Sequence, residues 1–405
     1  MADSTRILFI SGSIGLGHVL RDLAIAGELR RQRPGVAISW LAATPADGIL
    51  REAGETVLPE CADLADANAV AERAADGPRL SLIRYGFSAA RTWSRNIAVL
   101  RRVVSRERFD LVLGDETYDV TLALKKDRSL KTFPYATIYD FVGFQAMTGS
   151  LLERLGVWFW NHAWSKGADR ASEFVDLSLF VGEEEDVPDE PFGPMLPNRR
   201  DWARKRCRFV GHVLPFDPAG CADRAAVRAR LGYGPGPLVV GAIGGTAIGK
   251  ELLELCGRAW PILRDSVPEL RMVLVTGPRL DPAAVAVPRG VEVRGYVPAL
   301  HEHFAACDLA IVQGGGTTTI ELTVLRRPFL YFPLEGHCEQ EVSVGQRLAR
   351  HGAGVRMSLS RTTPEDLAKA AIANLGKEPV YRPVAADGAA AAARLVLELA
   401  DRGRG

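Results

Sequence analysis

Short apolar runs that end in glycine-rich turns, each followed by a segment with helical spacing, recur in both halves of the chain. In the first half, "RILFI" (6–10) leads into such a turn, and "VAISWLAA" (36–43) follows the helical segment. In the second half, "PLVVGAIGG" (237–245) and "DLAIVQGGG" (308–316) have the same organisation. Apolar strands that alternate with amphipathic helices build parallel sheets with helices on both faces. The sequence therefore predicts an α/β protein with two doubly wound parallel sheets.

The length of 405 residues is sufficient for two domains of ordinary size. We expect residues 1–216 to form the first domain and 217–405 the second, with a last helix (384–401) that can pack on either. The segment 186–206 is rich in proline and charge, which predicts a loop or linker.

The composition excludes several classes of protein. A net charge of +1 gives no electrostatic reason to expect a nucleic-acid partner. The six cysteines form no C-x-x-C pair, which argues against a zinc site and a disulfide framework. The N-terminus lacks the features of a signal peptide, and no apolar run reaches the ~18 residues of a membrane span. We therefore expect a cytoplasmic protein.

The first glycine-rich turn, "SGSIGLGHVLRD" (11–22), contains a histidine at the start of a helix. Gly15 and Gly17 allow a ligand to approach the backbone there. His18 is a candidate general base, and Asp115, at the end of the predicted strand segment 109–116, can orient it and stabilise its charged form. The alternative interpretation is a capping or solvated histidine beside ordinary loop acids.

The segment "QGGGTTTIE" (313–321) has three glycines at a strand end and three threonines at the start of a helix. Backbone amides and hydroxyls at the positive end of a helix suit a diphosphate. Glu321 can accept hydrogen bonds from ribose hydroxyls, and Glu339 and Gln340 form a polar pair suited to sugar hydroxyls. The residues predicted to bind such a ligand here are Gln313, Gly314, Gly315, Gly316, Thr317, Thr318, Glu321, Glu339 and Gln340.

The stretch from residue 313 to 348 resembles the donor signature of the GT-B nucleotide-sugar glycosyltransferases, H-x-G-x-x-S-x-x-E followed by G-x-P and P-x-x-x-D-Q. Gln313 stands at the family's histidine and Glu321 at its glutamate, whereas Glu339 replaces its aspartate. Upstream, "RGYVPAL" resembles the family's W-x-P-Q segment, which places Tyr296, where a tryptophan stacks on the base, and Val297 at the donor. The loop at 11–26 resembles that of the peptidoglycan N-acetylglucosaminyltransferase, which lies in the acceptor domain.

This resemblance implies a GT-B fold with two Rossmann-like domains facing a cleft. It implies an inverting hexosyltransferase that uses an NDP-sugar, a UDP-sugar first of all, as co-substrate, with His18 as base, Asp115 as its support, and neither metal nor cofactor. Inversion is favoured because Glu335 has Ser343, not a second glutamate, eight residues later. A nucleotide-sugar 2-epimerase and a non-catalytic nucleotide-sugar-binding partner protein are the alternatives.

The stretch "GAIGGTAIGKE" (241–251) is close to a phosphate-binding loop of ATPases, but Glu251 replaces the magnesium-binding Ser or Thr. The resemblance instead makes this the first turn of the donor domain, with Gly244, Gly245 and Thr246 facing the donor phosphates. We interpret Lys250 as a surface lysine of the following helix.

Two segments of the first half suggest contact with a membrane. Residues 79–108 carry eight arginines and one acid, and 151–164 carries three tryptophans and a phenylalanine. A basic amphipathic helix can lie on an anionic membrane, and the acceptor would then be a lipid or lipid-linked glycan rather than another small molecule. The alternative is a solvated basic face and a packed aromatic cluster.

Overall fold

The computed structural model describes residues 5–12, 16–65, 75–76, 79–80, 82–166, 174–245 and 247–403. The chain divides into two compact units. The first comprises Met1–Ala74, Leu82–Pro215 and Ala385–Gly405, and the second comprises Ala75–Ser81 and Phe216–Val384. The sequence-based division assigned 217–405 to the second domain and left the last helix open; that helix, α14, lies in the first unit.

The first unit contains a seven-stranded sheet in which all strand pairs are parallel. Its strands, in spatial order, are β3 (Thr56–Val57), β2 (Ala37–Leu41), β1 (Arg6–Ile10), β6 (Leu111–Asp115), β7 (Tyr135–Tyr139), β8 (Leu177–Val181) and β9 (Arg208–Gly211). The order reverses between β1 and β6, which creates a crevice at the carboxyl ends of these two strands.

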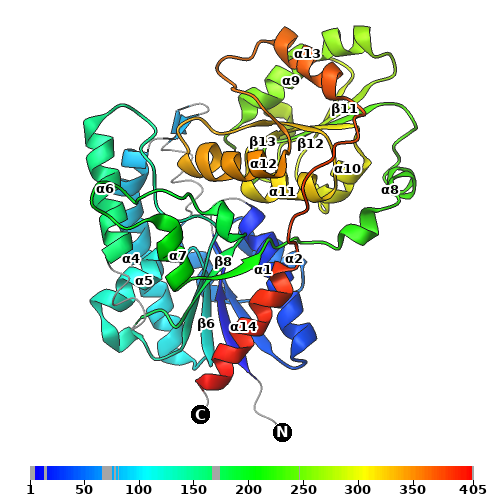
Figure 1. Ribbon diagram of the computed structural model, residues 1–405. Helices are drawn as coiled ribbons and strands as arrows, with labels where there is room; N and C mark the ends of the chain where they lie inside the picture. Colours follow the sequence, from blue (N-terminus) through cyan, green and yellow to red (C-terminus); the bar gives the residue numbers. More distant parts are fainter. Residues whose placement is uncertain are drawn as a thin grey trace. The chain divides into compact units, whose positions relative to one another are not determined.

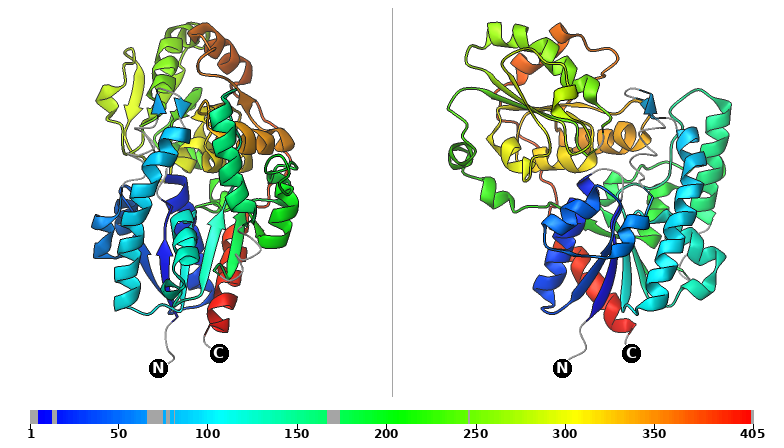
Figure 2. Two further views of the ribbon diagram at one scale, coloured as in Figure 1. Left: turned by 90° about the vertical axis from the view of Figure 1, so that its left-hand side faces the viewer. Right: turned by 180° about the vertical axis from the view of Figure 1, so that it is seen from behind.

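Helices cover both faces of this sheet, as Figures 1 and 2 show. On one face, Leu8 and Val112 belong to a core that includes Val99 and Leu124 from two of the helices. On the other, α1 packs along α14, and Gln32 donates to the Ala390 carbonyl (2.9 Å). The helices of this unit are α1 (Leu16–Gln32), α2 (Ala46–Glu52), α4 (Leu82–Arg106), α5 (Tyr118–Lys126), α6 (Leu151–Lys166), α7 (Arg199–Arg206) and α14 (Gly388–Arg402).

The prediction of a loop or linker at 186–206 is wrong for the last part of the segment, which forms α7 in the first unit. This helix begins because the Asn198 side chain accepts a hydrogen bond from the Asp201 amide (3.1 Å), a capping interaction that favours a helix start. The prolines upstream favoured a loop prediction over this helix start.

The second unit contains a six-stranded sheet, also parallel throughout. Its strands, in spatial order, are β12 (Val291–Arg294), β11 (Arg271–Val275), β10 (Leu238–Ala242), β13 (Leu309–Gln313), β14 (Phe329–Phe332) and β15 (Val355–Arg356). A separate two-stranded antiparallel sheet is formed by β4 (Ala75–Asp76) and β5 (Arg79–Leu80).

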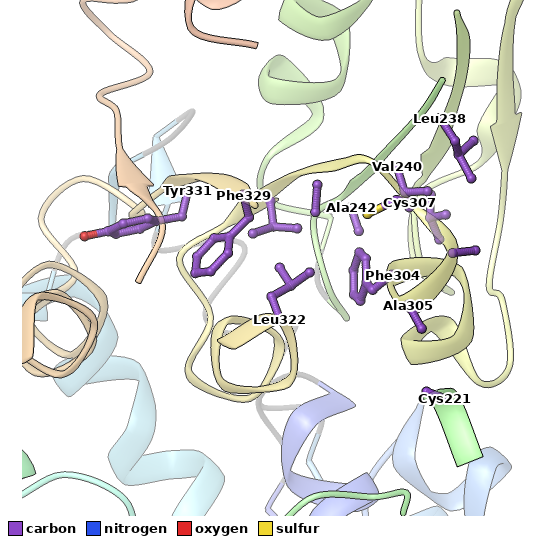
Figure 3. Close-up of a cluster of buried hydrophobic side chains, with 14 of the residues drawn as sticks. Cys221, Leu238, Val240, Ala242, Phe304, Ala305, Cys307, Leu322, Phe329 and Tyr331 are labelled. Atoms are coloured by element: carbon purple, nitrogen blue, oxygen red, sulfur yellow. The ribbon is translucent and has the colours of Figure 1, made fainter. Parts of the chain in front are cut away.

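Alternate side chains of the second sheet enter different cores. Met272 and Leu274 pack with α9 and α13 on one face, and on the other Leu322 and Phe304 point toward strand residues such as Phe329 (Figure 3). The helices of this unit are α8 (Arg224–Arg230), α9 (Lys250–Ser266), α10 (Leu300–Ala306), α11 (Gly316–Val324), α12 (Gly345–His351) and α13 (Pro364–Asn374). The prediction of two doubly wound parallel sheets is thus confirmed.

Candidate active site

His18 and Asp115 meet at the crevice of the first unit. His18 Nδ1 lies 2.8 Å from Asp115 Oδ2. Because β1 and β6 are neighbours, the turn after β1 and the carboxyl end of β6 lie at one sheet edge. The His18 side chain is 17% exposed and that of Asp115 is fully buried. Arg21 Nη2 also lies 2.9 Å from Nδ1. In the tautomer in which Nδ1–H donates to the carboxylate, Nε2 keeps a lone pair that can take a proton.

The turn before α1 makes room for the imidazole through a glycine. A Cβ atom on Gly12 would lie 2.8 Å from His18 Nδ1, closer than such contacts occur. Gly17 occupies the first turn of α1 directly before His18. The predicted Gly15 lies outside the described residues. A glycine is therefore required at position 12 by the packing of His18.

Arg21 joins this pair, and the sequence analysis missed it. One turn along α1 from His18, it donates to both oxygens of Asp115, from Nη2 (2.5 Å) and Nε (3.1 Å). It also donates from Nη1 to Asp140 Oδ2 (2.6 Å). Its side chain is 5% exposed. The signal was available: an arginine three residues after a candidate base, on the same helix face, beside strand-end acids.

Arg21 influences the pKa values of the two acids that it contacts. Burial raises the pKa of Asp115, but Arg21 and His18 outweigh it and hold that pKa below its ordinary value. Burial likewise opposes ionisation of Asp140, and Arg21 and His18 again lower its pKa. Arg21 thus favours the charged form of both carboxyl groups.

Two further carboxyl groups have pKa values displaced in the opposite direction. Burial and the neighbouring Asp115 raise the pKa of Asp22 well above its ordinary value. Asp22 is fully buried and accepts a hydrogen bond from Ser11 Oγ (2.6 Å). Burial and the nearby Asp140 raise the pKa of Glu116 in the same way. Burial thus raises the pKa values of Asp22 and Glu116, whereas Arg21 lowers those of Asp115 and Asp140.

In the second unit, the glycine turns after β10 and β13 lie beside each other. Gly249 has φ 115°, and a Cβ atom there would lie 3.2 Å from Gln313 Nε2. Gly244 has φ 84°, and Gly245 is buried in the same turn. The predicted Thr246 lies outside the described residues. These contacts place the first turn of the unit at the end of β13, where the sequence predicts the donor phosphates.

Lys250 does not point to a phosphate loop. It begins α9 and its Nζ lies 3.3 Å from Glu254 Oε1, one helical turn away. Its side chain is 41% exposed. This is the ion pair of a surface lysine, as the sequence predicts.

The start of α11 is closely packed against two loops. A Cβ atom on Gly314 would lie 2.8 Å from Pro333 Cα, and one on Gly316 would lie 3.7 Å from Glu339 Oε1. Gly315 is the residue before the helix, and a Cβ atom built on it would meet no atom within 4 Å. Thr317 and Thr318 are partly buried in the first turn. The third threonine, Thr319, is turned inward, because its hydroxyl donates to the Gly315 carbonyl (2.9 Å).

Glu321 is 6% exposed, and burial raises its pKa to about 8. A carboxyl group in such a position has few polar neighbours and is suited to bind ligand hydroxyls that replace the lost water. A strongly perturbed carboxyl group at a strand-end site is a candidate for function.

The loop between β14 and α12 contains the other predicted sugar contacts. Gln340 Oε1 accepts a hydrogen bond from the Leu334 amide (2.8 Å), a contact that fixes the loop. Glu339 and Gln340 begin a π-helical segment, Glu339–Val344, a form that often marks functional sites. The sequence analysis missed Arg347, which is buried (5% exposed) with Nη1 3.6 Å from the Cβ position of Gly316.

Tyr296 and Val297 follow β12, the edge strand on the side of β10 and β11. Both are partly buried, and Val297 packs against the core that contains Phe304 and Leu322. All the described candidates of this unit thus follow the carboxyl ends of its strands, the edge where ligands of parallel sheets bind.

The described arginines of α4 do not form a free basic face. Arg101, Arg102 and Arg106 pair with Asp127, Asp63 and Glu60 respectively. The side chains of Arg79, Arg84 and Arg91 lie outside the described part of the chain.

Helix α6 differs from α4, because part of it is exposed and apolar. Trp164 packs among aromatic rings that include Tyr118 and Phe144. Elsewhere on the helix a set of large apolar side chains is exposed: Leu151, Leu152, Leu155, Phe159 and Trp160. Among the described residues, no helix combines the length and apolarity needed to cross a membrane.

Comparison with known proteins finds similarity to glycosyltransferases. Residues 239–395 match the family model described as glycosyltransferase family 28 C-terminal domain. An uncharacterized glycosyltransferase of Methanopyrus kandleri is 28% identical over 229 residues; the match covers 56% of this chain and 61% of that protein.

A relative from Symbiobacterium thermophilum is 26% identical over 373 residues, 90% of this chain and 86% of its own. It is named UDP-N-acetylglucosamine–N-acetylmuramyl-(pentapeptide) pyrophosphoryl-undecaprenol N-acetylglucosamine transferase. Among solved structures, the glycotransferase of kitacinnamycin superposes with a TM-score of 0.59 at 18% identity, covering 100% of this chain and 96% of that one. This similarity and the two parallel sheets establish the GT-B fold.

Proposed function

The chain belongs to the glycosyltransferases with the GT-B fold, and we propose on this premise that it transfers a sugar from a UDP-sugar to an acceptor hydroxyl with inversion. The observation that carries the proposal is the His18–Asp115 pair, 2.8 Å apart and fixed by Arg21. A buried carboxylate that orients a partly exposed imidazole is the arrangement of a general base.

In the proposed reaction, the acceptor hydroxyl gives its proton to His18 Nε2. Its oxygen attacks the anomeric carbon of the donor as the bond from that carbon to the diphosphate oxygen breaks. A single displacement inverts the configuration at this carbon. Asp115 stabilises the imidazolium that forms, because its carboxylate lies 2.8 Å from Nδ1.

The donor is proposed to bind at the strand ends of the second unit. The nucleoside diphosphate leaves with negative charge, which the backbone amides at the start of α11 and in the turn at Gly244 can stabilise. Glu321 would accept from the ribose hydroxyls and Glu339 from the sugar hydroxyls, to which Gln340 would donate from Nε2. In this proposal the donor is a co-substrate, and no resident metal or cofactor takes part.

We propose that the acceptor is a lipid or a lipid-linked glycan, and that the enzyme works at the cytoplasmic face of a membrane. Support comes from the exposed apolar side chains of α6, of which Leu151, Leu152 and Phe159 are more than 60% exposed. The Symbiobacterium relative is named for a lipid-linked acceptor. Apolar side chains of this size bind a bilayer interface through burial of their area.

The proposed function is tested first by measuring donor binding and then by replacing the proposed base, His18. UDP or dTDP is expected to raise the unfolding temperature without added metal, since a ligand of the folded state stabilises it. His18→Ala should retain this shift and lose sugar transfer by about 10²- to 10⁴-fold. Stabilisation by magnesium-ATP alone would contradict the proposal. Turnover of the donor without any acceptor would indicate an epimerase, and donor binding without turnover a binding protein.

The proposed contact of α6 with a membrane is tested separately by flotation with phosphatidylglycerol and phosphatidylcholine vesicles. Replacing Leu151, Leu155 and Phe159 by serine should abolish flotation with either vesicle. Ile372→Ser, a change of a 40% exposed residue on α13, is the matched control and should float as the wild type does. Equal flotation of both variants would rule out α6 as the contact.

A further inference from the structure

Glu116 lies beside the reactive nitrogen of His18 and has no part in the mechanism described so far. Its Oε2 is 3.9 Å from His18 Nε2, the nitrogen that faces away from Asp115. The two side chains have similar exposure, 17% for His18 and 19% for Glu116. Arg21 and Asp115, by contrast, are almost completely buried. His18 and Glu116 thus present their polar atoms on the accessible side of the cluster.

The backbone of Glu116 is held in a conformation that glutamate rarely adopts. Its φ is 51°, in the left-handed region. The conformation is fixed by hydrogen bonds from its amide to the Ile138 carbonyl (3.0 Å) and from the Tyr118 amide to its own carbonyl (2.9 Å). A glycine or asparagine would occupy this position with less strain. Strain at a residue beside a candidate base is a reason to look for a use of its side chain.

The charge state of Glu116 is compatible with an active base. Burial and the carboxylates of Asp140 and Asp115 raise its pKa, while Arg21 only partly opposes them. Among the described residues, Asp140 Oδ1 is buried with no hydrogen-bond partner, and a proton on Glu116 would supply one. The raised pKa favours the neutral form of Glu116, which adds no negative charge beside His18 Nε2 and still has an oxygen that can accept a hydrogen bond.

We propose that Glu116 binds the acceptor, and that the acceptor carries a second hydroxyl group next to the one that is attacked. The attacked hydroxyl donates to His18 Nε2 and its neighbour donates to Glu116 Oε2. Two acceptor atoms 3.9 Å apart suit two adjacent hydroxyl groups that each form a hydrogen bond of about 2.8 Å. The class of acceptor is therefore a vicinal diol, as sugars and polyols provide. This inference rests on the proposed function and specifies the acceptor end of the same site.

The test combines changes in the enzyme with changes in the acceptor. Octyl glycosides of glucose, galactose, N-acetylglucosamine and rhamnose serve as acceptor probes with UDP- and dTDP-sugars. Monodeoxy versions of the best probe then remove one hydroxyl at a time. In the wild type, loss of the hydroxyl next to the attacked one should raise KM about three- to tenfold, the effect of one hydrogen bond. In Glu116→Ala the same deletion should have no further effect, because the partner is already missing.

The conservative variant separates binding from structure. Glu116→Gln keeps a neutral group with an oxygen acceptor and should retain the wild-type KM, whereas Glu116→Ala should raise the acceptor KM and leave kcat within about twofold. Asp119→Asn is the matched control: it changes a nearby carboxyl group on α5, whose oxygen accepts from the Val120 amide, and should alter neither constant.

Three results would overturn the inference. The first is an equal penalty for the deoxy acceptor in wild type and Glu116→Ala. The second is a loss of activity in Glu116→Gln as large as in Glu116→Ala. The third is a wild type that transfers sugar to other hydroxyl compounds but to none of these diol-bearing probes, which leaves the proposed function intact. A wild type that binds donor and transfers sugar to nothing contradicts both proposals.

Discussion

Arg21 donates hydrogen bonds to both carboxylate oxygens of Asp115, at 2.5 and 3.1 Å. One guanidinium thereby fixes the plane of the carboxylate and holds it ionised beside His18. The same group reaches Asp140, so a single side chain connects the carboxyl ends of β6 and β7 to the first turns of α1. We therefore expect kcat and the free energy of unfolding to depend on the contacts of Arg21.

Replacing Arg21 by lysine should lower kcat by about 10- to 100-fold, because an ammonium cannot reproduce the two-pronged contact and Asp115 loses its fixed orientation. Arg21→Met should also lower the free energy of unfolding by about 3–5 kcal/mol, the usual cost of breaking a buried ion pair. Arg33→Lys is the control, since Arg33 pairs with Asp401 at an exposed site. Kinetics and thermal unfolding of the three variants check this; comparable losses for Arg33→Lys would refute a special role for Arg21.

Gly12→Ala should displace the imidazole of His18, because the added Cβ would lie 2.8 Å from Nδ1. We expect kcat to fall by about 100-fold, as a shift of about 1 Å can cause, with donor binding unchanged. Gly27→Ala is matched to it, being a glycine on α1 with no atom near the Cβ position. That change should stabilise the protein by about 0.5–1 kcal/mol. An active Gly12→Ala variant would show that His18 does not need its present position.

Asp22→Asn and Asp115→Asn should differ widely in their effect on kcat. Burial and Asp115 raise the pKa of Asp22 and so favour its neutral form, and a neutral amide should therefore replace it with little change in kcat or stability. Asp115→Asn removes the charge that supports His18 and should lower kcat by about 10³-fold or more. Comparison of kcat for the two variants is the measurement, and a severe loss in Asp22→Asn would mean that Asp22 is ionised.

Glu321 should make the unliganded protein less stable as pH rises from 4.5 to 8. In this window the unfolded chain ionises at the ordinary pKa of 4.5 while the folded chain keeps its proton up to about pH 8. The folded state therefore binds more protons, and the free energy of unfolding falls with pH. Glu321→Gln should remove this dependence and raise stability at pH 7 by up to about 3 kcal/mol.

The same variant should weaken UDP binding if Glu321 accepts from the ribose. Chemical denaturation at pH 5 and pH 7, together with UDP titration, measures both effects. A Glu321→Gln variant that binds UDP as tightly as the wild type would contradict the assignment of Glu321 to the ribose. If the free energy of unfolding of this variant depended on pH as in the wild type, Glu321 would not have the raised pKa.

The local pattern of the sequence was sufficient to predict the class of fold. Apolar runs such as 237–245 and 308–316, each ending in glycine and followed by a helix, specify parallel strands because only such strands are buried on both faces. His18 and Asp115 could also be predicted as a pair, since both follow strands whose carboxyl ends meet at one edge. Segment 186–206 was misassigned because the cap at Asn198 is a weaker signal than four prolines.

The partners of these residues were decided by tertiary structure. Arg21 is an ordinary helical arginine in the sequence, and its role arises because β6 and β7 bring Asp115 and Asp140 within reach of one guanidinium. The pKa values of Glu116 and Glu321 rise because folding removes water from them, an effect of burial that residue type cannot encode. The sequence alone determined which side chains follow the strands; the tertiary structure decided their charges, because a charge depends on the water and the neighbours that folding leaves around it.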